Sequence, residues 1–192
     1  MSTPLKVLGL DVSTTTIGIG LLEVNGSDIS FLSIEHFNPP KKGDLITRLA
    51  KTQRYIKKVI KSLKPDYIAI EDIVEYMPNK TTSHSIIALA QVNRIICLTA
   101  YDYLKRSPEL FNVLSIRHGI KHTKALPSKD QIPAVLEKHL NITLPPLLIT
   151  KGKNKGNFAP EYYDRADGVA VALYYSFILT GKIKPKTPLL HP

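Results

Sequence analysis

Two acidic residues directly follow short apolar segments of the sequence. Asp11 comes after Lys6–Leu10, and Glu71 comes after Tyr67–Ile70. Both segments have the composition of buried strands, and open α/β sheets place their functional sites at the carboxyl ends of strands. If the two strands are adjacent and parallel, their carboxylates converge.

A second pair of acids, Asp164 and Asp167, lies three residues apart at the start of a predicted helix. This spacing places both carboxylates on one face of the helix. Clustered carboxylates repel one another unless a cation neutralises them, and hard oxygen ligands select Mg²⁺ or Mn²⁺ over softer metals. Two such ions activate water and stabilise a leaving oxygen during phosphodiester cleavage. The four acids therefore predict a magnesium-dependent nuclease site.

Each acid also has a structural interpretation. Asp164 and Asp167 are favourable charges at the positive end of a helix dipole. Asp11, followed by Ser-Thr-Thr, suits a turn closed by a local side-chain hydrogen bond. A charged residue directly after an Ile-Ala-Ile strand has little structural role to play there. Glu71 therefore indicates a functional site more strongly than the other three acids do.

The surrounding pattern predicts the elements that position these acids. Helices with a 3.6-residue period are expected at Asp44–Leu63, Thr82–Leu104, Ser128–Leu140 and Glu161–Leu179. Besides the two strands above, strands are expected at Thr16–Val24, Asp28–Phe37 and Leu110–Ile116. A meander followed by strand and helix alternation predicts an α/β fold with a mixed five-stranded sheet and helices on its faces. We expect one domain over residues 1–181 and a basic Pro/Lys-rich tail over residues 182–192.

Composition favours an intracellular protein with a polyanionic partner. Lysine and arginine number 26 against 16 acids in 192 residues, a net charge of +10, which suits nucleic acid and also an acidic membrane surface. Cys97 is the single cysteine, so a disulfide framework and a cysteine-based zinc site are excluded. We recognise no signal peptide and no segment that spans a bilayer comfortably, and expect a cytoplasmic location without membrane attachment.

Several segments follow one another in the order of the motifs of a known family: Leu8–Asp11, Gly18–Gly20, Ala69–Glu71 and Tyr163–Ala172. Together they resemble the RuvC family of Holliday-junction resolvases, members of the ribonuclease H-like superfamily. The resemblance implies a ribonuclease H-like sheet of three antiparallel strands followed by two parallel ones. It also implies two Mg²⁺ ions per site, with Mn²⁺ as a substitute, held by the catalytic acids Asp11, Glu71, Asp164 and Asp167.

Two further segments extend the resemblance. Ser128–Ile132 is similar to a lysine-bearing helix start near the scissile phosphate, which gives Lys129 a catalytic role in phosphate contact or transition-state charge. A lysine on an exposed first helical turn is the structural alternative. Ala88–Arg94 resembles the helix that packs against the second protomer of the family's dimers, so a homodimer is expected.

The expected DNA contacts are less specific. The family places an aromatic wedge where this chain has Val74, and Tyr76 and Met77 are close enough in sequence to replace it. Residues 145–163 are predicted to form a mobile basic loop that contacts DNA, with a solvated linker as the alternative. The residues expected to contact DNA are Ser13, Tyr76, Arg117, Lys151, Lys153 and Lys155.

The leading hypothesis is a homodimeric endodeoxyribonuclease that resolves four-way junctions by paired symmetric nicks. A second hypothesis keeps the fold and assigns flaps, branched replication DNA or RNA-containing substrates. Gly9–Thr16 also resembles the first phosphate loop of sugar kinases and actin-like ATPases, but the chain lacks their second glycine-rich motif. A binding protein with vestigial acids is the fourth hypothesis.

Overall fold

The computed structural model of the chain describes residues 3–73 and 83–184. Its strands form one sheet in the spatial order β3-β2-β1-β4-β5. β1, β2 and β3 are antiparallel neighbours, whereas β4 runs parallel to β1 and β5 runs parallel to β4. The predicted mixed sheet is therefore confirmed. The strand bounds are Leu5–Val12 (β1), Ile17–Asn25 (β2), Asp28–Phe37 (β3), Tyr67–Glu71 (β4) and Glu109–Phe111 (β5).

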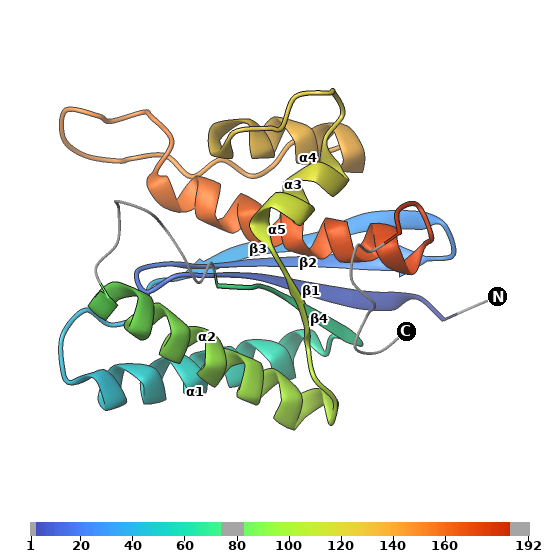
Figure 1. Cartoon of the computed structure of the whole chain (residues 1–192). Coiled ribbons are helices and arrows are strands. Elements are labelled where there is room, and N and C mark those ends of the chain that lie inside the picture. Colours follow the sequence, from blue (N-terminus) through green and yellow to red (C-terminus); the bar gives the residue numbers. More distant parts are fainter. Residues whose placement is uncertain (1–2, 74–82, 185–192) are drawn as a thin grey trace.

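Helices cover both faces of the sheet (Figure 1). On one face lie α1 (Leu45–Leu63) and α2 (Ser83–Leu104). The other face carries α3 (Val113–Ile120), α4 (Ile132–Leu140) and α5 (Pro160–Leu179), with α5 directly against β1 and β2. In the described part of the chain, no helix is long and apolar enough to cross a membrane.

Successive side chains of each strand point to opposite faces of the sheet, so the strands contribute to two separate hydrophobic cores. Leu8 and Leu10 of β1 enter the core beneath α1 and α2, together with Ile68 and Ile70 of β4. Val7, which precedes Leu8 in β1, enters the core beneath α5. Because successive strand residues point to opposite faces, the sequence of each strand determines which of its side chains reach α5.

Glycines let α5 approach the sheet at backbone distance. A Cβ added at Gly9 would collide with the carbonyl oxygen of Gly168, and one added at Gly18 would collide with the carbonyl oxygen of Asp164. Any larger residue at either strand position would push α5 away from β1 and β2. The glycines therefore fix the height of the α5 acids above the sheet.

Helix α1 has clear start and stop signals. The Asp44 side chain accepts a hydrogen bond from the Thr47 backbone N–H at 2.9 Å, which caps the amino terminus. Lys64 has a left-handed backbone (φ 50°) and ends the helix. The side chains buried against the sheet and α2 form one stripe, Thr52, Ile56, Val59 and Ile60.

The strand predicted over Leu110–Ile116 is wrong beyond Phe111. Asn112 caps a helix instead, because its side chain accepts a hydrogen bond from the Leu114 backbone N–H at 2.8 Å. Ile116 and Ile120, four residues apart, are then both buried on one side of α3. A short apolar run fits either element, and here the cap decides for helix.

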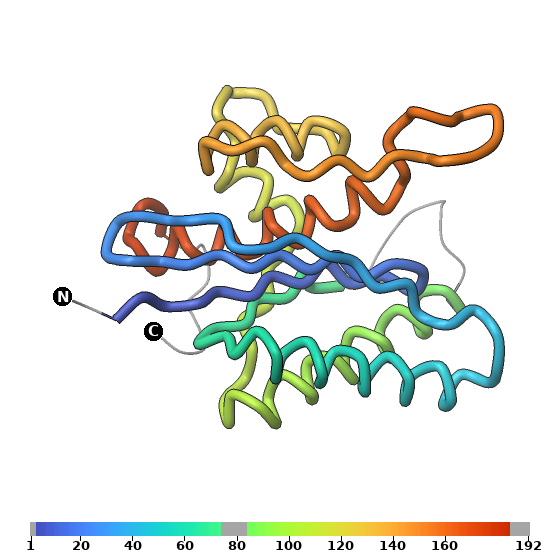
Figure 2. Tube along the Cα trace, turned by 180° about the vertical axis from the view of Figure 1, so that it is seen from behind, coloured from blue at the N-terminus to red at the C-terminus, as the bar shows by residue number. Residues whose placement is uncertain are grey.

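The lysine-rich stretch before α5 forms a hairpin-like loop. Leu148 and Phe158 are bridged in antiparallel fashion, and the backbones of Ile149 and Asn157 are joined by a hydrogen bond of 2.9 Å. In both views the loop projects from the molecule next to the start of α5 (Figure 1, Figure 2). It therefore stands at the amino-terminal end of the helix that carries Asp164 and Asp167.

Candidate active site

The alternation of β1 and β4 directs two acids toward α5. Leu10 packs beneath α1 and α2, so the next residue, Asp11, points to the opposite face. Ile70 packs on the same side as Leu10, so Glu71 also points toward α5. Leu10 and Ile70 are register partners in the parallel pairing of β1 with β4. The two carboxylates thus project from neighbouring strands on the same face of the sheet, near the carboxyl ends of both strands. Asp11 is still part of β1.

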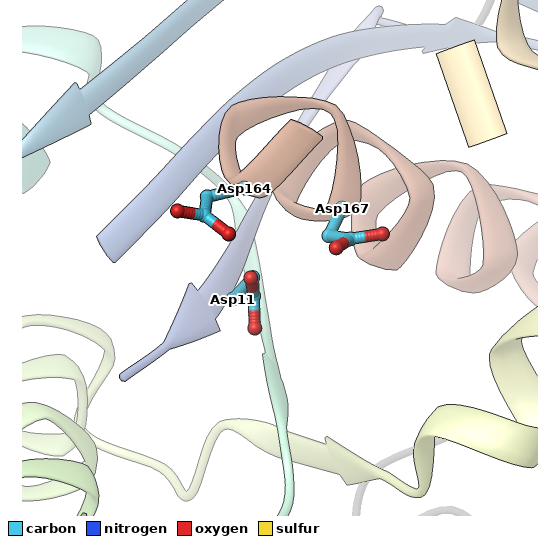
Figure 3. A group of neighbouring side chains, drawn as sticks. All are labelled: Asp11, Asp164 and Asp167. Carbon is cyan, nitrogen blue, oxygen red and sulfur yellow. The ribbon is translucent and has the colours of Figure 1, made fainter. Parts of the chain in front are cut away.

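Asp164 and Asp167 meet Asp11 from above the sheet. Both lie in the second turn of α5, and one carboxylate oxygen from each of the three aspartates falls within 4.8 Å of the others. Figure 3 shows the Asp11 side chain rising from the end of β1 below the two α5 side chains. The contact of Gly18 with the Asp164 backbone sets this spacing. The predicted convergence is present for these three acids.

Glu71 is not one of the three closely spaced aspartates, but its charge interacts with two of them, Asp11 and Asp167. Its charge raises the pKa of Asp11, and the charge of Asp167 raises the pKa of Glu71. The backbone of β4 is held firmly at this point, because the Asp72 N–H donates to the Phe111 carbonyl oxygen at 2.9 Å. Glu71 is therefore the fourth acid of the cluster, at its margin.

Burial and mutual repulsion raise the pKa values of three of these carboxyls. Burial is the largest cause, and the charges of Glu71 and Asp167 add to it at Asp11, whose pKa is well above its usual range. The pKa of Glu71 rises to about 7 and that of Asp167 to about 6. Both charged and neutral forms are then populated near neutrality, and a bound cation would favour the charged forms.

Lys129 is the cation nearest to the α5 acids. Its Nζ lies 2.5 Å from Oδ1 of Asp164 and 3.3 Å from Oδ2 of Asp167. Burial lowers the pKa of Lys129, but the hydrogen bond to Asp164 and the neighbouring carboxylate charges outweigh burial and raise it. The side chain leaves the start of a short 3-10 helix, Lys129–Gln131, that precedes α4. The resemblance predicted a lysine near the scissile phosphate, and the structure places Lys129 beside the two α5 acids.

Arg117 approaches the same cluster from α3. Its positive charge lowers the pKa values of both Glu71 and Asp167. Its Nε is buried and has no hydrogen-bond partner among the described residues. Its position differs from the prediction, because it lies within a helix and not in the loop after a strand.

The donor set fits a hard divalent cation. Three part-buried aspartates offer oxygen atoms within sharing distance of one point, and Glu71 adds a fourth carboxylate nearby. Magnesium and manganese prefer such oxygen ligands. Two positive side chains, Lys129 and Arg117, partly compensate the carboxylates, which leaves net negative charge for a cation to neutralise.

The remaining predicted DNA contacts are more dispersed. The Ser13 hydroxyl donates to the Thr16 carbonyl oxygen at 2.7 Å and accepts from the Thr16 N–H at 2.9 Å, so it closes the β1–β2 turn. Tyr76 and the rest of the predicted wedge region lie outside the described residues. Lys151, Lys153 and Lys155 are all exposed on the hairpin-like loop.

Asn93 is a residue that sequence reasoning missed. It is fully buried in α2, and its amide nitrogen donates to the Glu71 carbonyl oxygen at 3.0 Å. This bond fixes the carboxyl end of β4 against α2 and so positions the Glu71 side chain. A lone asparagine among Ile, Val and Leu on a predicted buried helix was the available signal, because a buried amide requires partners.

Comparison with known proteins decides the family. The family model described as "Crossover junction endodeoxyribonuclease RuvC" matches residues 7–149. The chain belongs to the RuvC family. The match includes Asp11, Glu71 and Lys129, whereas Asp164 and Asp167 lie beyond it. The resemblance inferred from the motifs is therefore confirmed.

Individual relatives extend the match along the chain. The RuvC protein of Fusobacterium nucleatum is 27% identical over 140 residues, which cover 72% of this chain and 70% of that protein. A RuvC protein of Neisseria meningitidis serogroup C is 25% identical over 189 residues, covering 96% and 94% of the two chains.

Solved structures establish the fold. Thermus thermophilus RuvC in complex with a Holliday junction substrate superposes with a TM-score of 0.71 at 14% identity, over 93% of this chain and 96% of that one. The yeast mitochondrial Holliday junction resolvase Ydc2 superposes with a TM-score of 0.61 at 13% identity, over 88% and 77% of the two chains. The sheet is the ribonuclease H-like sheet of the resolvases.

Proposed function

We propose that this RuvC-family chain is a magnesium-dependent endodeoxyribonuclease that resolves four-way DNA junctions by paired symmetric nicks. The observation that carries the proposal is the convergence of Asp11, Asp164 and Asp167 within 4.8 Å, beside Glu71. The family relationship supports the substrate, since the relatives are named crossover junction endodeoxyribonucleases and the T. thermophilus protein is in complex with a Holliday junction.

In this proposal the four carboxylates hold two Mg²⁺ ions, for which Mn²⁺ can substitute. When bound, such ions supply an activated water and stabilise the leaving oxygen. Asp11, whose pKa is raised by burial and by the charges of Glu71 and Asp167, lies between the Glu71 side and the α5 side of the cluster and is suited to a shared ligand. Lys129 and Arg117 bring positive charge to the edge where a DNA phosphate would enter.

A homodimer matches the symmetry of a four-way junction. In support, α2 leaves large apolar side chains in solvent, with exposed fractions of 54% for Ile87, 59% for Leu98 and 49% for Tyr101. Exposed apolar side chains gathered on one helix are typical of protein–protein contacts. We propose that this helix pairs with its copy, and that residues 1–181 form one nuclease domain acting on intracellular DNA.

The basic hairpin-like loop supports a contact with DNA near the cleaved strand. Its three lysines are exposed, and it leads directly into α5. Such a loop contacts phosphates without reading sequence. Lys151, Lys153 and Lys155 thus contribute affinity in the proposal, whereas the acids provide the chemistry.

The direct test is incubation with a labelled four-way junction, with and without magnesium, beside flaps, linear duplexes and RNA–DNA hybrids of the same sequence. We expect magnesium-dependent paired nicks in the junction and slower cleavage of the others. Faster cleavage of a flap or hybrid would assign the chain to another ribonuclease H-like nuclease. Binding without cleavage of any substrate would favour an inactive binding protein.

A further inference from the structure

Most of the net charge of the chain is concentrated on one helix outside the acidic site. Residues 41–64, which contain α1, carry nine lysines or arginines and one acid, Asp44, a net charge of +8 against +10 for the whole chain. The other 168 residues are therefore nearly neutral. Neither the acidic cluster nor the loop before α5 accounts for this concentration.

The charges are arranged as a continuous exposed stripe. Lys51, Arg54, Lys58 and Lys61 follow one another at three- and four-residue spacing and are all exposed, so they lie along one side of α1. That side is opposite the buried stripe through Ile56. The helix has 19 residues and is about 28 Å long.

The stripe has little internal compensation. Among the described residues, none of the α1 cations forms an ion pair within 4 Å; the ion pairs there involve Arg94 and Lys129. Two acids, Glu35 and Asp102, line the grooves beside α1 without forming an ion pair with it. Closely spaced like charges repel one another, and an external polyanion relieves that repulsion.

Helix α1, which carries the stripe, begins near the end of the sheet where the acids lie. Phe37, the last residue of β3, pairs with Ile17, which pairs with Val12 beside Asp11. The chain leaves this edge through Lys41 and then enters α1, which runs back along the sheet on the face opposite α5 (Figure 2). A rod-like polyanion on α1 would thus start near the end of the sheet that carries the acids and run along the opposite face.

We propose that the α1 stripe, Lys51, Arg54, Lys58 and Lys61, binds the phosphate backbone of a duplex arm of the DNA substrate, independently of base sequence. The inference rests on the proposed function for the identity of the substrate. A duplex presents one charge per about 3.4 Å along each strand, so the stripe faces several consecutive phosphates. The stripe adds affinity and orients the arm, and it takes no part in the chemistry.

The test compares the triple variant Lys51→Gln/Arg54→Gln/Lys58→Gln with a matched control, Lys124→Gln/Lys138→Gln/Lys184→Gln. The control removes the same charge from exposed positions outside α1. Junction affinity is measured over a range of salt concentrations, with long arms and with arms shorter than one helical turn. Thermal melting establishes that both variants fold.

For long arms we expect the α1 variant to lower the slope of log affinity against log salt by about three, roughly one for each positive side chain that is removed. The control should lower it by less than about one. With short arms the difference between the variants should shrink, and single-turnover cleavage at saturating protein should stay at the wild-type rate.

Equal slopes for the α1 variant, the control and the wild type would overturn the proposal, as would weaker binding of the α1 variant to anionic lipid vesicles with an unchanged DNA slope. Failure of the proposed function has a different signature. If the wild type cleaves no junction but its duplex binding depends on α1, the proposal for the α1 stripe is supported and the resolvase assignment is refuted.

Discussion

Lys129 and Asp164 form the closest charged contact of the site, with Nζ and Oδ1 2.5 Å apart. Because Asp167 is also within 3.3 Å of this nitrogen, the lysine is held by both α5 acids at once. An ammonium in this position partly compensates the negative charge of the cluster.

The first prediction concerns this lysine. Lys129→Gln should lower the single-turnover cleavage rate by roughly 10²-fold, as removal of one stabilising charge near the reacting atoms does. Lys129→Arg keeps the charge and should retain more activity than the glutamine variant. Rates measured at saturating magnesium and protein separate this effect from weak binding. If the glutamine variant cleaved at the wild-type rate, Lys129 would have no role in catalysis.

The raised pKa values predict how the metal-free protein responds to pH. The folded protein binds protons on Asp11, Glu71 and Asp167 more tightly than the unfolded chain does. The stability that this provides is complete below the unfolded pKa values and is lost as pH rises through the folded ones. For Glu71 the window runs from 4.5 to about 7, and the loss should be about 1–3 kcal/mol.

Thermal melting in a chelator over this pH range checks the prediction. The melting temperature should fall as pH rises, and Glu71→Gln should flatten the dependence. Added magnesium should restore stability mostly at the high-pH end, because it binds the deprotonated carboxylates. A melting temperature that rises steadily across the window would contradict the assigned shifts.

Gly18 supports a third prediction. In Gly18→Ala the new methyl group meets the Asp164 backbone, so α5 must move and the α5 acids lose their spacing to Asp11. We expect a loss of stability of about 1–3 kcal/mol and a clear loss of cleavage. Gly181→Asn is the control, because a Cβ added there would meet no other atom within 4 Å in the described part of the chain and asparagine tolerates its positive φ. Equal activity of the two variants would refute the backbone contact.

Asn93 is predicted to be a positioning residue for Glu71. Asn93→Ala removes the bond to the Glu71 carbonyl oxygen and should cost about 1–3 kcal/mol of stability. Its more specific effect should be a higher magnesium requirement for cleavage, with unchanged affinity for junction DNA. Thr99→Ala, which removes a buried hydroxyl from the same helix, should lower stability without changing the magnesium requirement. A similar requirement in both variants would make Asn93 merely structural.

The positions of the acids could be predicted because strand alternation is local information. Apolar Leu10 and Ile70 must face a core, so the following acids face the other way. The parallel pairing of β1 with β4 was the condition for the two acids to converge, and the structure fulfils it. The spacing of Asp164 and Asp167 needs only helical geometry.

Features that depend on tertiary contacts could not be predicted in the same way. Because Asn112 caps a helix, the segment expected to continue a strand forms α3, and Arg117 lies within this helix. The bond from Asn93 to Glu71 joins residues 22 apart; a buried asparagine indicates that a partner is needed, but not which residue supplies it. The backbone contact of Gly18 with α5 likewise becomes visible only when the helix lies on the sheet.

The most direct test of the proposed site replaces Asp11 by asparagine, which keeps the shape of the side chain and removes its charge. Cleavage and binding of a labelled four-way junction are then measured separately in magnesium. We predict that Asp11→Asn abolishes cleavage, retains junction binding and melts at a temperature no lower than the wild type. Cleavage at the wild-type rate would contradict the assignment of the site.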